Sequence, residues 1–340
     1  MKWAIDTLAT SQDFTELDSF ADSLRNPSIF QTGRMARVYA QSPDTKPLVL
    51  VARGSSGEIG ASVAGVTFTH MRRGLPVVSQ LSSHFTVRGA PIAPSGPEGL
   101  EATTMLLQEL PHRMGPNSVY IRCYPDFGAP TVPILQLCGY AREDWLNIVI
   151  NLEKGERQLL EEMSKHRRKG IRTATKAGFE VIRISTTDGV DVLYRLLADA
   201  HRHLMVPFQT RPLFNAVLRD LGSTGNALML IAKRGDEVLA GRIVLLYGGT
   251  AYDWYGGSTP QGKQLRVDEW LTWNAMLLAK DRGAAQFDFG GAGKPDEDYG
   301  PREFKRRFGG CVTNVGRYTR VLARLRFAVA DLAQAVLRRI

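Results

Sequence analysis

A strand–turn–strand pattern of apolar and polar residues occurs twice in the 340-residue chain. Residues 48–65 read LVLVARGSSGEIGASVAG, and residues 228–245 read LMLIAKRGDEVLAGRIVL. In each segment an apolar run ends at a basic residue, a polar turn with Gly follows, and a second run rich in small residues begins. This is the pattern of a β-hairpin. Its recurrence over a long period indicates a duplicated module.

The elements predicted after the two hairpins follow a similar order. The first copy continues with strands at 66–72 and 78–89, a helix at 98–114, a strand at 118–124, a short helix at 132–138 and a closing strand at 144–152. The second continues with a strand at 251–256, a helix at 267–282, a strand at 286–289, a helix at 301–308 and a closing strand at 312–321. Gly139 and Gly309 end the two short helices, as is usual at a helix C-terminus. The pattern predicts an α+β protein of two tandem modules, each a mixed and mostly antiparallel sheet flanked by helices, with no coiled-coil arm.

These elements assign residues 1–152 to the first module and residues 153–320 to the second. A basic helix at 153–178 is expected to join the modules, and helices at 191–204 and 212–221 to open the second one. Residues 321–340 have the pattern of an amphipathic helix bordered by arginines. Packing of this helix on the body is the favoured interpretation, and peripheral contact with the inner membrane face is the alternative.

Composition and charge add constraints on partners and location. The length fits about two domains of ~150 residues each. A net charge of +9 predicts attraction to polyanions such as nucleic acid, nucleotide-sugars or anionic lipid. No apolar run is long enough to span a membrane, and the N-terminal segment has no apolar signal core, so we expect a cytoplasmic protein. The dispersed Cys123, Cys138 and Cys311 argue against a structural zinc site.

Several enzyme classes lack their characteristic motifs. His201 and His203 are two residues apart on a predicted helix, so they point to different sides and cannot chelate one metal ion. The sequence has no H-E-x-x-H, no Gly-x-Ser-x-Gly and no GxxxxGK[ST] motif. Metal-dependent hydrolysis, Ser-His-Asp catalysis and P-loop nucleotide hydrolysis therefore have no support, and we expect no metal.

A basic cluster lies on the predicted linking helix. Lys165, Arg168 and Arg172 are spaced by three and four residues, which places them near one face. No acidic residue interrupts residues 165–176, whereas solvated helix faces usually mix both signs. Binding to the phosphates of a nucleic acid or a nucleotide-sugar is one interpretation, and an ordinary solvated helix is the other.

A glycine-rich turn follows the strand at 286–289. Residues 287–294 read FDFGGAGK, and the glycines allow the backbone to approach a ligand closely. Phe304 and Phe308 share one face of the next short helix, with Lys305 beside them. A Lys held over apolar surface beside such a turn suits an oxyanion stabiliser. A cationic helix with a pair of phenylalanines is the structural alternative.

Together these segments resemble the Fem family, whose members add amino acids to peptidoglycan precursors and are built from two GNAT-like modules. The run MSKHRRKGIRTATKAG at 163–178 resembles the family's linking motif. DFGG at 288–291 followed by FKRRFGG at 304–310 resembles its C-terminal motif. FQT at 30–32, RGAP at 88–91 and VLAG at 238–241 fit further family positions, so the resemblance spans about residues 28–320.

The resemblance implies transfer of an amino acid from aminoacyl-tRNA to an amine of a peptidoglycan precursor, UDP-muramyl-peptide or lipid-linked, during cell-wall bridge formation. It implies no cofactor besides the aminoacyl-tRNA co-substrate. Lys305 would stabilise the oxyanion or the leaving oxygen, and Phe304 would shape the wall beside it. Arg211 would bind the precursor's phosphates. Tyr252 and Tyr255 would line the acceptor groove, and Arg37 is a further phosphate candidate.

Two other functions remain open. One is an acyl-CoA or acyl-carrier-dependent N-acyltransferase, linked to exopolysaccharide production, since one fold supports several functions. GNAT enzymes bind the CoA pyrophosphate with a [RQ]-x-x-G-x-[GA] turn that opens the helix after the fourth strand. QGKQLR at 261–266 lacks this glycine spacing, and RGAP at 88–91 has a proline without an N–H donor, so acyl-CoA is disfavoured. The other is an inactive module that binds tRNA or a nucleotide-sugar.

Overall fold

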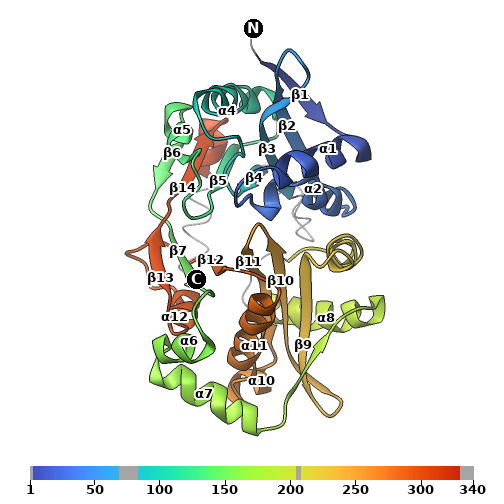
Figure 1. Ribbon diagram of the computed structural model, residues 1–340, viewed down its shortest axis with the longest axis vertical. Helices are drawn as coiled ribbons and strands as arrows, with labels where there is room; N and C mark the ends of the chain where they lie inside the picture. Colours follow the sequence, from blue (N-terminus) through green and yellow to red (C-terminus); the bar gives the residue numbers. More distant parts are fainter. Residues whose placement is uncertain (1–2, 69–82, 204–207, 330–340) are drawn as a thin grey trace. The chain divides into compact units, whose positions relative to one another are not determined.

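The computed structural model describes residues 3–68, 83–203 and 208–329 and contains two units, each built around one seven-stranded sheet (Figure 1). One unit comprises Met1–Asp144 with Val315–Ile340, and the other comprises Trp145–Asn314. Each sheet is mixed and mostly antiparallel, with helices packed on it. The predicted α+β architecture of two tandem modules is confirmed, and no long helical arm interrupts the described residues.

The sheet of the first unit is antiparallel except between β4 and β5. Its strand order is β1 (Ala4–Leu8), β2 (Thr45–Arg53), β3 (Ile59–Phe68), β4 (His84–Arg88), β5 (Tyr120–Tyr124), β14 (Arg317–Val321) and β6 (Ala141–Glu143). Its helices are α1 (Ser11–Asp22), α2 (Gly33–Ala40), α4 (Pro97–Glu109) and α5 (Val132–Leu137), with short 3-10 turns at Ile29–Gln31 and Leu110–Arg113. Successive residues of a strand face opposite sides, so Leu50 packs in the core under α4 while Val49 and Val51 pack against α1 and α2.

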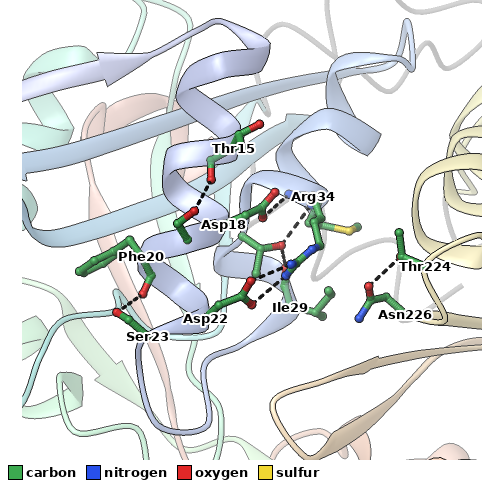
Figure 2. Close-up of polar contacts among 12 residues, drawn as sticks. Thr15, Asp18, Phe20, Asp22, Ser23, Ile29, Arg34, Thr224 and Asn226 are labelled. Atoms are coloured by element: carbon green, nitrogen blue, oxygen red, sulfur yellow. Dashed lines mark hydrogen bonds and ion pairs between the residues drawn. The ribbon is translucent and has the colours of Figure 1, made fainter.

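Helix α2 is held by side chains of α1 (Figure 2). The Asp18 carboxylate accepts a hydrogen bond from the Arg34 main-chain N–H at 2.8 Å, and Asp22 binds the Arg34 guanidinium at 2.8 and 3.0 Å. Gly33 is required at the contact, because a Cβ there would lie 1.8 Å from the Phe14 carbonyl oxygen. Polar and steric constraints together fix the α1–α2 pair.

The fully buried Gln31 bridges β3 and β4 where the two strands diverge. Its amide nitrogen donates to the carbonyl oxygens of Ala64 at 2.8 Å and Arg88 at 2.7 Å, and its Oε1 accepts from the Ala64 N–H at 2.8 Å. The side chain therefore replaces backbone ladder bonds between Ala64 and Arg88. In this structure the Gln of the FQT segment is bonded to the main chain.

The sheet of the second unit is antiparallel except between β11 and β12. Its strand order is β13 (Cys311–Asn314), β7 (Leu146–Asn151), β12 (Gln286–Gly291), β11 (Thr250–Ser258), β10 (Glu237–Tyr247), β9 (Ala227–Arg234) and β8 (Glu180–Arg183). Its helices are α6 (Glu156–Glu162), α7 (Lys165–Lys176), α8 (Thr187–His203), α9 (Arg211–Ala216, continued by a π-helical turn over Val217–Gly222), α10 (Pro260–Gln264), α11 (Val267–Asp281) and α12 (Gly300–Arg306). Helix α11 packs in the core on one face. Helix α8 covers the other, where a Cβ at Gly241 would lie 2.4 Å from Leu193.

Both predicted hairpins are present, as β2–β3 and β9–β10. The strands expected to close the modules are exchanged between the sheets. Strand β7, from the predicted closing segment 144–152 of the first copy, pairs with β12 and β13 in the second sheet. The segment 312–321 is two strands separated at Gly316 (φ 73°), and only β13 joins the second sheet while β14 joins the first. Figure 1 shows red β14 beside β5 and green β7 beside β12. The apolar pattern identifies a strand but not the edge with which it pairs.

The predicted linking helix at 153–178 is two helices. The chain is extended at Met163, and Ser164 caps α7 because its hydroxyl accepts from the Arg167 N–H at 3.2 Å. Of the predicted C-terminal helix at 321–340, residue 321 ends β14, residues 324–329 are helical, and the remainder lies outside the described residues. Residues 69–82, where parts of the strands at 66–72 and 78–89 were expected, also lie outside. Within the described ranges, no helix is long and apolar enough to cross a membrane.

Deleting residues 315–340 removes β14, which pairs with β5 on one side and β6 on the other and contains the buried Tyr318. We expect the first unit to lose cooperative unfolding, because β5 is left as an unpaired edge. The second unit, continuous from Trp145 to Asn314, is expected to keep its amide protection. Hydrogen exchange across Tyr120–Tyr124 measures the effect. A chain ending at Val329 is the control, and equal protection of β5 in both truncations would contradict the structural role of β14.

Candidate active site

Strands β11 and β12 separate soon after they begin. They pair in parallel only from Thr250–Tyr252 against Gln286–Asp288. Beyond these residues β11 continues to Ser258 along β10, whereas β12 bends to pair with β7 through Gly291. The facing edges of the two strands therefore have main-chain groups with no ladder partner on the other strand. We call this divergence the β11/β12 splay.

The glycine-rich turn after β12 is held by helix α12. Asp288 accepts a hydrogen bond from the Gly290 N–H at 2.6 Å, and Gly290 has a φ of 67°, which favours glycine. The Lys305 ammonium donates to the Gly291 carbonyl oxygen at 2.7 Å. The Arg302 guanidinium donates to three carbonyl oxygens of the same turn, those of Ala292, Lys294 and Pro295. Two cations of α12 thus fix the backbone of the turn.

Lys305 and Phe304 lie beside the glycine-rich turn, as the sequence analysis expected. Both side chains are half-buried, and the Phe304 and Phe308 rings meet edge to face with centroids 5.4 Å apart. Phe308 is buried in the core with Phe289. The arrangement combines a cation, an apolar wall and a turn rich in main-chain polar groups.

Arg167 is a structural residue of this site that the sequence analysis did not separate from the basic cluster. Its side chain is 2% exposed, and its guanidinium lies over the rings of Phe304 at 4.5 Å and Phe308 at 4.2 Å. It donates to the Phe304 carbonyl oxygen at 2.8 Å and pairs with Glu269 of α11 at 2.7 Å. Burial lowers the pKa of Arg167, and the Glu269 carboxylate opposes that shift. The signal in the sequence was the apolar face on which Arg167 lies with Ile171.

A second buried charge cluster lies between β10, β11 and α11. Arg242 is almost fully buried and donates to Asp253 at 2.5 Å and to Asp268 at 2.8 Å. Burial alone would lower the pKa of Arg242, but the two carboxylates outweigh it and raise that pKa. Burial raises the pKa of Asp288, although its hydrogen bonds and the charge of Lys305 oppose the shift.

Within the described part of the chain, no group of three or more His, Cys, Asp or Glu is placed to hold a metal ion.

An aromatic cluster borders β11 on the face covered by α8. Its members come from three separate segments: Tyr194 and His201, Phe208 and Phe214, and Trp254 and Tyr255. The Tyr255 ring lies 5.4 Å from that of Phe208 and 5.3 Å from that of Phe214. Tyr252 lies on the same strand and is buried. The sequence analysis selected Tyr255 but could not assemble the cluster, because its members are distant along the chain.

The two candidate phosphate-binding arginines are in different units. Arg211 begins α9, one turn before Phe214, and its half-exposed side chain pairs with Asp191 at 2.9 Å. Arg37 lies on α2 of the first unit and pairs with Asp18. The structure therefore brings Arg211, but not Arg37, to the unit that holds Lys305.

The basic residues of α7 divide into three groups. Arg167 faces the core, and Arg168 donates to the carbonyl oxygens of Leu160, Glu161 and Met163 at the end of α6. The remaining cations are exposed, and among the described residues none of them forms an ion pair with a carboxylate: Lys165, Lys169, Arg172 and Lys176. We call these four the α7 stripe. With Arg168 and Thr173 they line a surface hollow of about 450 Å³.

Comparison with known proteins relates this site to a superfamily. Residues 162–306 match the model of the acetyltransferase (GNAT) domain. A sequence search of curated proteins finds no match. Among solved structures, FemX is 15% identical with a TM-score of 0.69, covering 95% of this chain and 99% of its own.

Two further structures show the same tandem architecture. The C-terminal domain of a putative lysylphosphatidylglycerol synthetase from Agrobacterium fabrum is 14% identical with a TM-score of 0.59, covering 97% of both chains. A tandem GNAT protein from the clavulanic acid biosynthesis pathway is 10% identical with a TM-score of 0.56, covering 94% of this chain and 99% of its own. At such low identity these likenesses establish the fold. The part of the chain with the splay and α12 is a GNAT-type acyltransferase domain.

The substitution Arg167→Met leaves Glu269 without its buried partner, so we expect the unfolding free energy to fall by about 3–5 kcal/mol. The double variant Arg167→Met/Glu269→Leu should recover much of that loss, because it buries no unpaired charge. Arg172→Met on the exposed face of α7 is the matched control, with an expected change within about 0.5 kcal/mol. Urea denaturation measures all three. Equal losses for Arg167→Met and Arg172→Met would refute a buried, paired Arg167.

Proposed function

We propose that this protein, whose second unit contains a GNAT-type acyltransferase domain, transfers an amino acid from aminoacyl-tRNA to an amine of a peptidoglycan precursor peptide. The observation that carries the proposal is the direct connection between the α7 stripe and helix α12. A surface suited to RNA phosphates begins beside the Lys305 helix. The proposal places the protein in the cytoplasm, peripheral to the membrane where the acceptor is lipid-linked.

The start of α7 is bonded to α12 by two hydrogen bonds. The Ser164 N–H donates to the Arg307 carbonyl oxygen at 3.1 Å, and Arg167 donates to that of Phe304. Lys165 follows directly, and the stripe continues to Lys176, about 16 Å along the helix axis. Unpaired cations on one exposed face attract a phosphate backbone without requiring a base sequence. An RNA strand along α7 would thus place its end near the glycine-rich turn.

The segment between β11 and α11 argues against acyl-CoA as the donor. In GNAT enzymes this segment binds pyrophosphate through main-chain amides at the start of the helix. Here residues 260–264 form α10, with Pro260 in its first turn. Asp268 and Glu269 occupy the first turn of α11, where their carboxylates already compensate the positive end of the helix dipole. The sequence-based objection to acyl-CoA therefore gains a structural reason.

Lys305 supports the chemistry of ester aminolysis. Attack of an amine on the aminoacyl ester produces a tetrahedral oxyanion, which a positioned cation stabilises. An ammonium group has three donors, so Lys305 can keep its bond to the Gly291 carbonyl and bind a substrate oxygen at the same time. Phe304 would exclude water from one side of the reacting ester. Positioning and charge stabilisation account for the reaction without a covalent enzyme intermediate.

The acceptor is assigned to the opposite strand of the splay. Tyr255 and the aromatic cluster provide a half-buried wall, with Tyr252 at its base. Arg211 would exchange its exposed pairing with Asp191 for a precursor phosphate, to which a guanidinium binds with two parallel hydrogen bonds. Arg37 is kept as a separate phosphate candidate of the first unit. These four assignments are part of the proposal.

The first test offers two donors to the purified protein. With a charged tRNA pool and UDP-muramyl-pentapeptide, mass spectrometry should detect one added amino acid on the acceptor. Lys305→Ala should lower kcat by about 10²–10³-fold while tRNA still binds, because it removes an oxyanion donor. Lys46→Ala, an exposed cation of the first unit, is the control. Acyl transfer from acetyl-CoA with none from charged tRNA would favour the acyl-CoA-dependent alternative.

The second test removes the charge of the α7 stripe. Replacing its four cations by Gln should weaken tRNA binding and reduce the slope of log K against log salt by about 3, since each lost phosphate contact lowers the slope by about 0.7–0.9. Filter binding at several salt concentrations measures the slope. The control removes the same charge from four exposed cations elsewhere: Arg25, Lys46, Lys263 and Arg324. Equal slopes for the two variants would exclude the stripe as the RNA contact.

A further inference from the structure

His201 of α8 belongs to the aromatic cluster and has no role in the chemistry described above. Its Nδ1 lies 2.8 Å from the Leu197 carbonyl oxygen. A carbonyl oxygen only accepts, so Nδ1 carries the proton in this hydrogen bond and Nε2 has the lone pair. The contact thus selects one tautomer, with Nε2 as the acceptor.

The imidazole ring is also fixed by its neighbours. The Phe208 ring lies 4.6 Å from it at an interplanar angle of 33°, and the Tyr255 ring meets it edge to face at 5.7 Å. Together with Leu197, these contacts come from a helix, a following segment and strand β11. The side chain remains partly exposed. These contacts restrain the orientation of the ring, and a fixed position is the first requirement for a general base.

The surroundings of His201 favour the neutral form of the imidazole. Burial lowers its pKa, and the hydrogen bond to Leu197 only partly opposes that shift. The titratable groups of the surrounding elements include the phenols of Tyr194 and Tyr255, the buried Arg242–Asp253 pair and two exposed ion pairs. The exposed pairs are Arg202 with Asp199, and Arg211 with Asp191, so each carries compensating charges.

His201 of α8 contacts β11 through Tyr255, and Lys305 of α12 binds β12 through Gly291, so the two side chains reach different strands of the splay. Tyr255, in contact with His201, lies three residues beyond Tyr252, where β11 last pairs with β12. Gly291, bound by Lys305, lies three residues beyond Asp288, the partner of Tyr252. Three residues of a strand span about 10 Å. Beyond the last paired residues, β11 is therefore in contact with an imidazole of α8 and β12 with an ammonium group of α12.

We propose that Nε2 of His201 accepts the proton of the acceptor amine during acyl transfer. The amine nitrogen attacks the ester carbon, the N–C bond forms, and the proton of that nitrogen passes to Nε2. The C–O ester bond then breaks with its electron pair on the ribose oxygen, which takes a proton from Lys305. Solvent returns the proton from the imidazolium to the Lys305 amine, which balances the cycle. The donor named here rests on the proposed function, whereas the role of His201 applies to any acyl donor of this site.

The experiment measures the pH dependence of transfer in two His201 variants. In the wild type, kcat should fall on the acidic side below the pKa of His201, which NMR of the ring nitrogens reports independently. His201→Asn keeps a donor toward Leu197 but has no acceptor at the Nε2 position. It should lose about 10²–10⁴-fold in kcat together with the acidic limb of the profile. His112→Asn, an exposed histidine of the first unit, is the control and should leave the profile unchanged.

His201→Ala distinguishes proton transfer from ring packing. Added imidazole should raise the activity of this variant at least tenfold. The increase should be proportional to the concentration of neutral imidazole, which a purely structural defect would not produce. A variant profile that keeps the acidic limb, or an absence of imidazole rescue in a folded protein, overturns the proposal. The assays use whichever donor supports wild-type transfer. Transfer from acetyl-CoA alone would refute the tRNA donor, but the His201 variants would still test the role of His201 with that donor. No transfer from either donor would refute both proposals.

Discussion

The arrangement of the second unit depends on one buried guanidinium. Arg167 contacts two phenylalanine rings of the α12 segment, donates to a carbonyl oxygen of that helix and pairs with Glu269 of α11. A charge can be buried only where it is paired and hydrogen-bonded. The cation therefore joins three helices that the core alone could pack in several ways. Lys305 lies on the helix that this residue positions, so the geometry of the candidate site follows from a residue that need not touch a substrate.

The exchange of β7 and β14 is a second constraint. In the first sheet β14 lies beside β5, and in the second sheet β7 lies beside β12. In the chain, β14 directly follows the residues of the second unit, and β7 directly follows residues 1–144 of the first unit. The second unit is continuous, whereas the first is completed only by residues after Val315. A central strand cannot be left out, because both of its neighbours would expose unpaired main-chain groups. The folding of the first unit therefore depends on residues that follow the second unit in the chain.

The splay between β11 and β12 separates the chemical roles. The β12 side presents a cation and a turn with fixed backbone, which suits the stabilisation of negative charge. The β11 side presents an aromatic wall with one neutral imidazole. The paired charges around Arg242 join β10, β11 and α11, because Asp253 and Asp268 bind the same guanidinium. Low local dielectric strengthens such interactions, so small displacements of these side chains would change proton affinities at the site.

Much of the fold follows from the sequence alone. The hairpins 48–65 and 228–245, helix α11 and the segment with Lys305 are local features, because apolar periodicity and helix-ending glycines act over a few residues. The sequence did not determine which edge β7 and β14 would pair with, nor that Ser164 would divide the linking helix. It also could not distinguish buried Arg167 from the exposed cations beside it. These choices depend on contacts between residues far apart in the chain, such as Arg167 with Phe304 and His201 with Tyr255, and only the tertiary structure decides them.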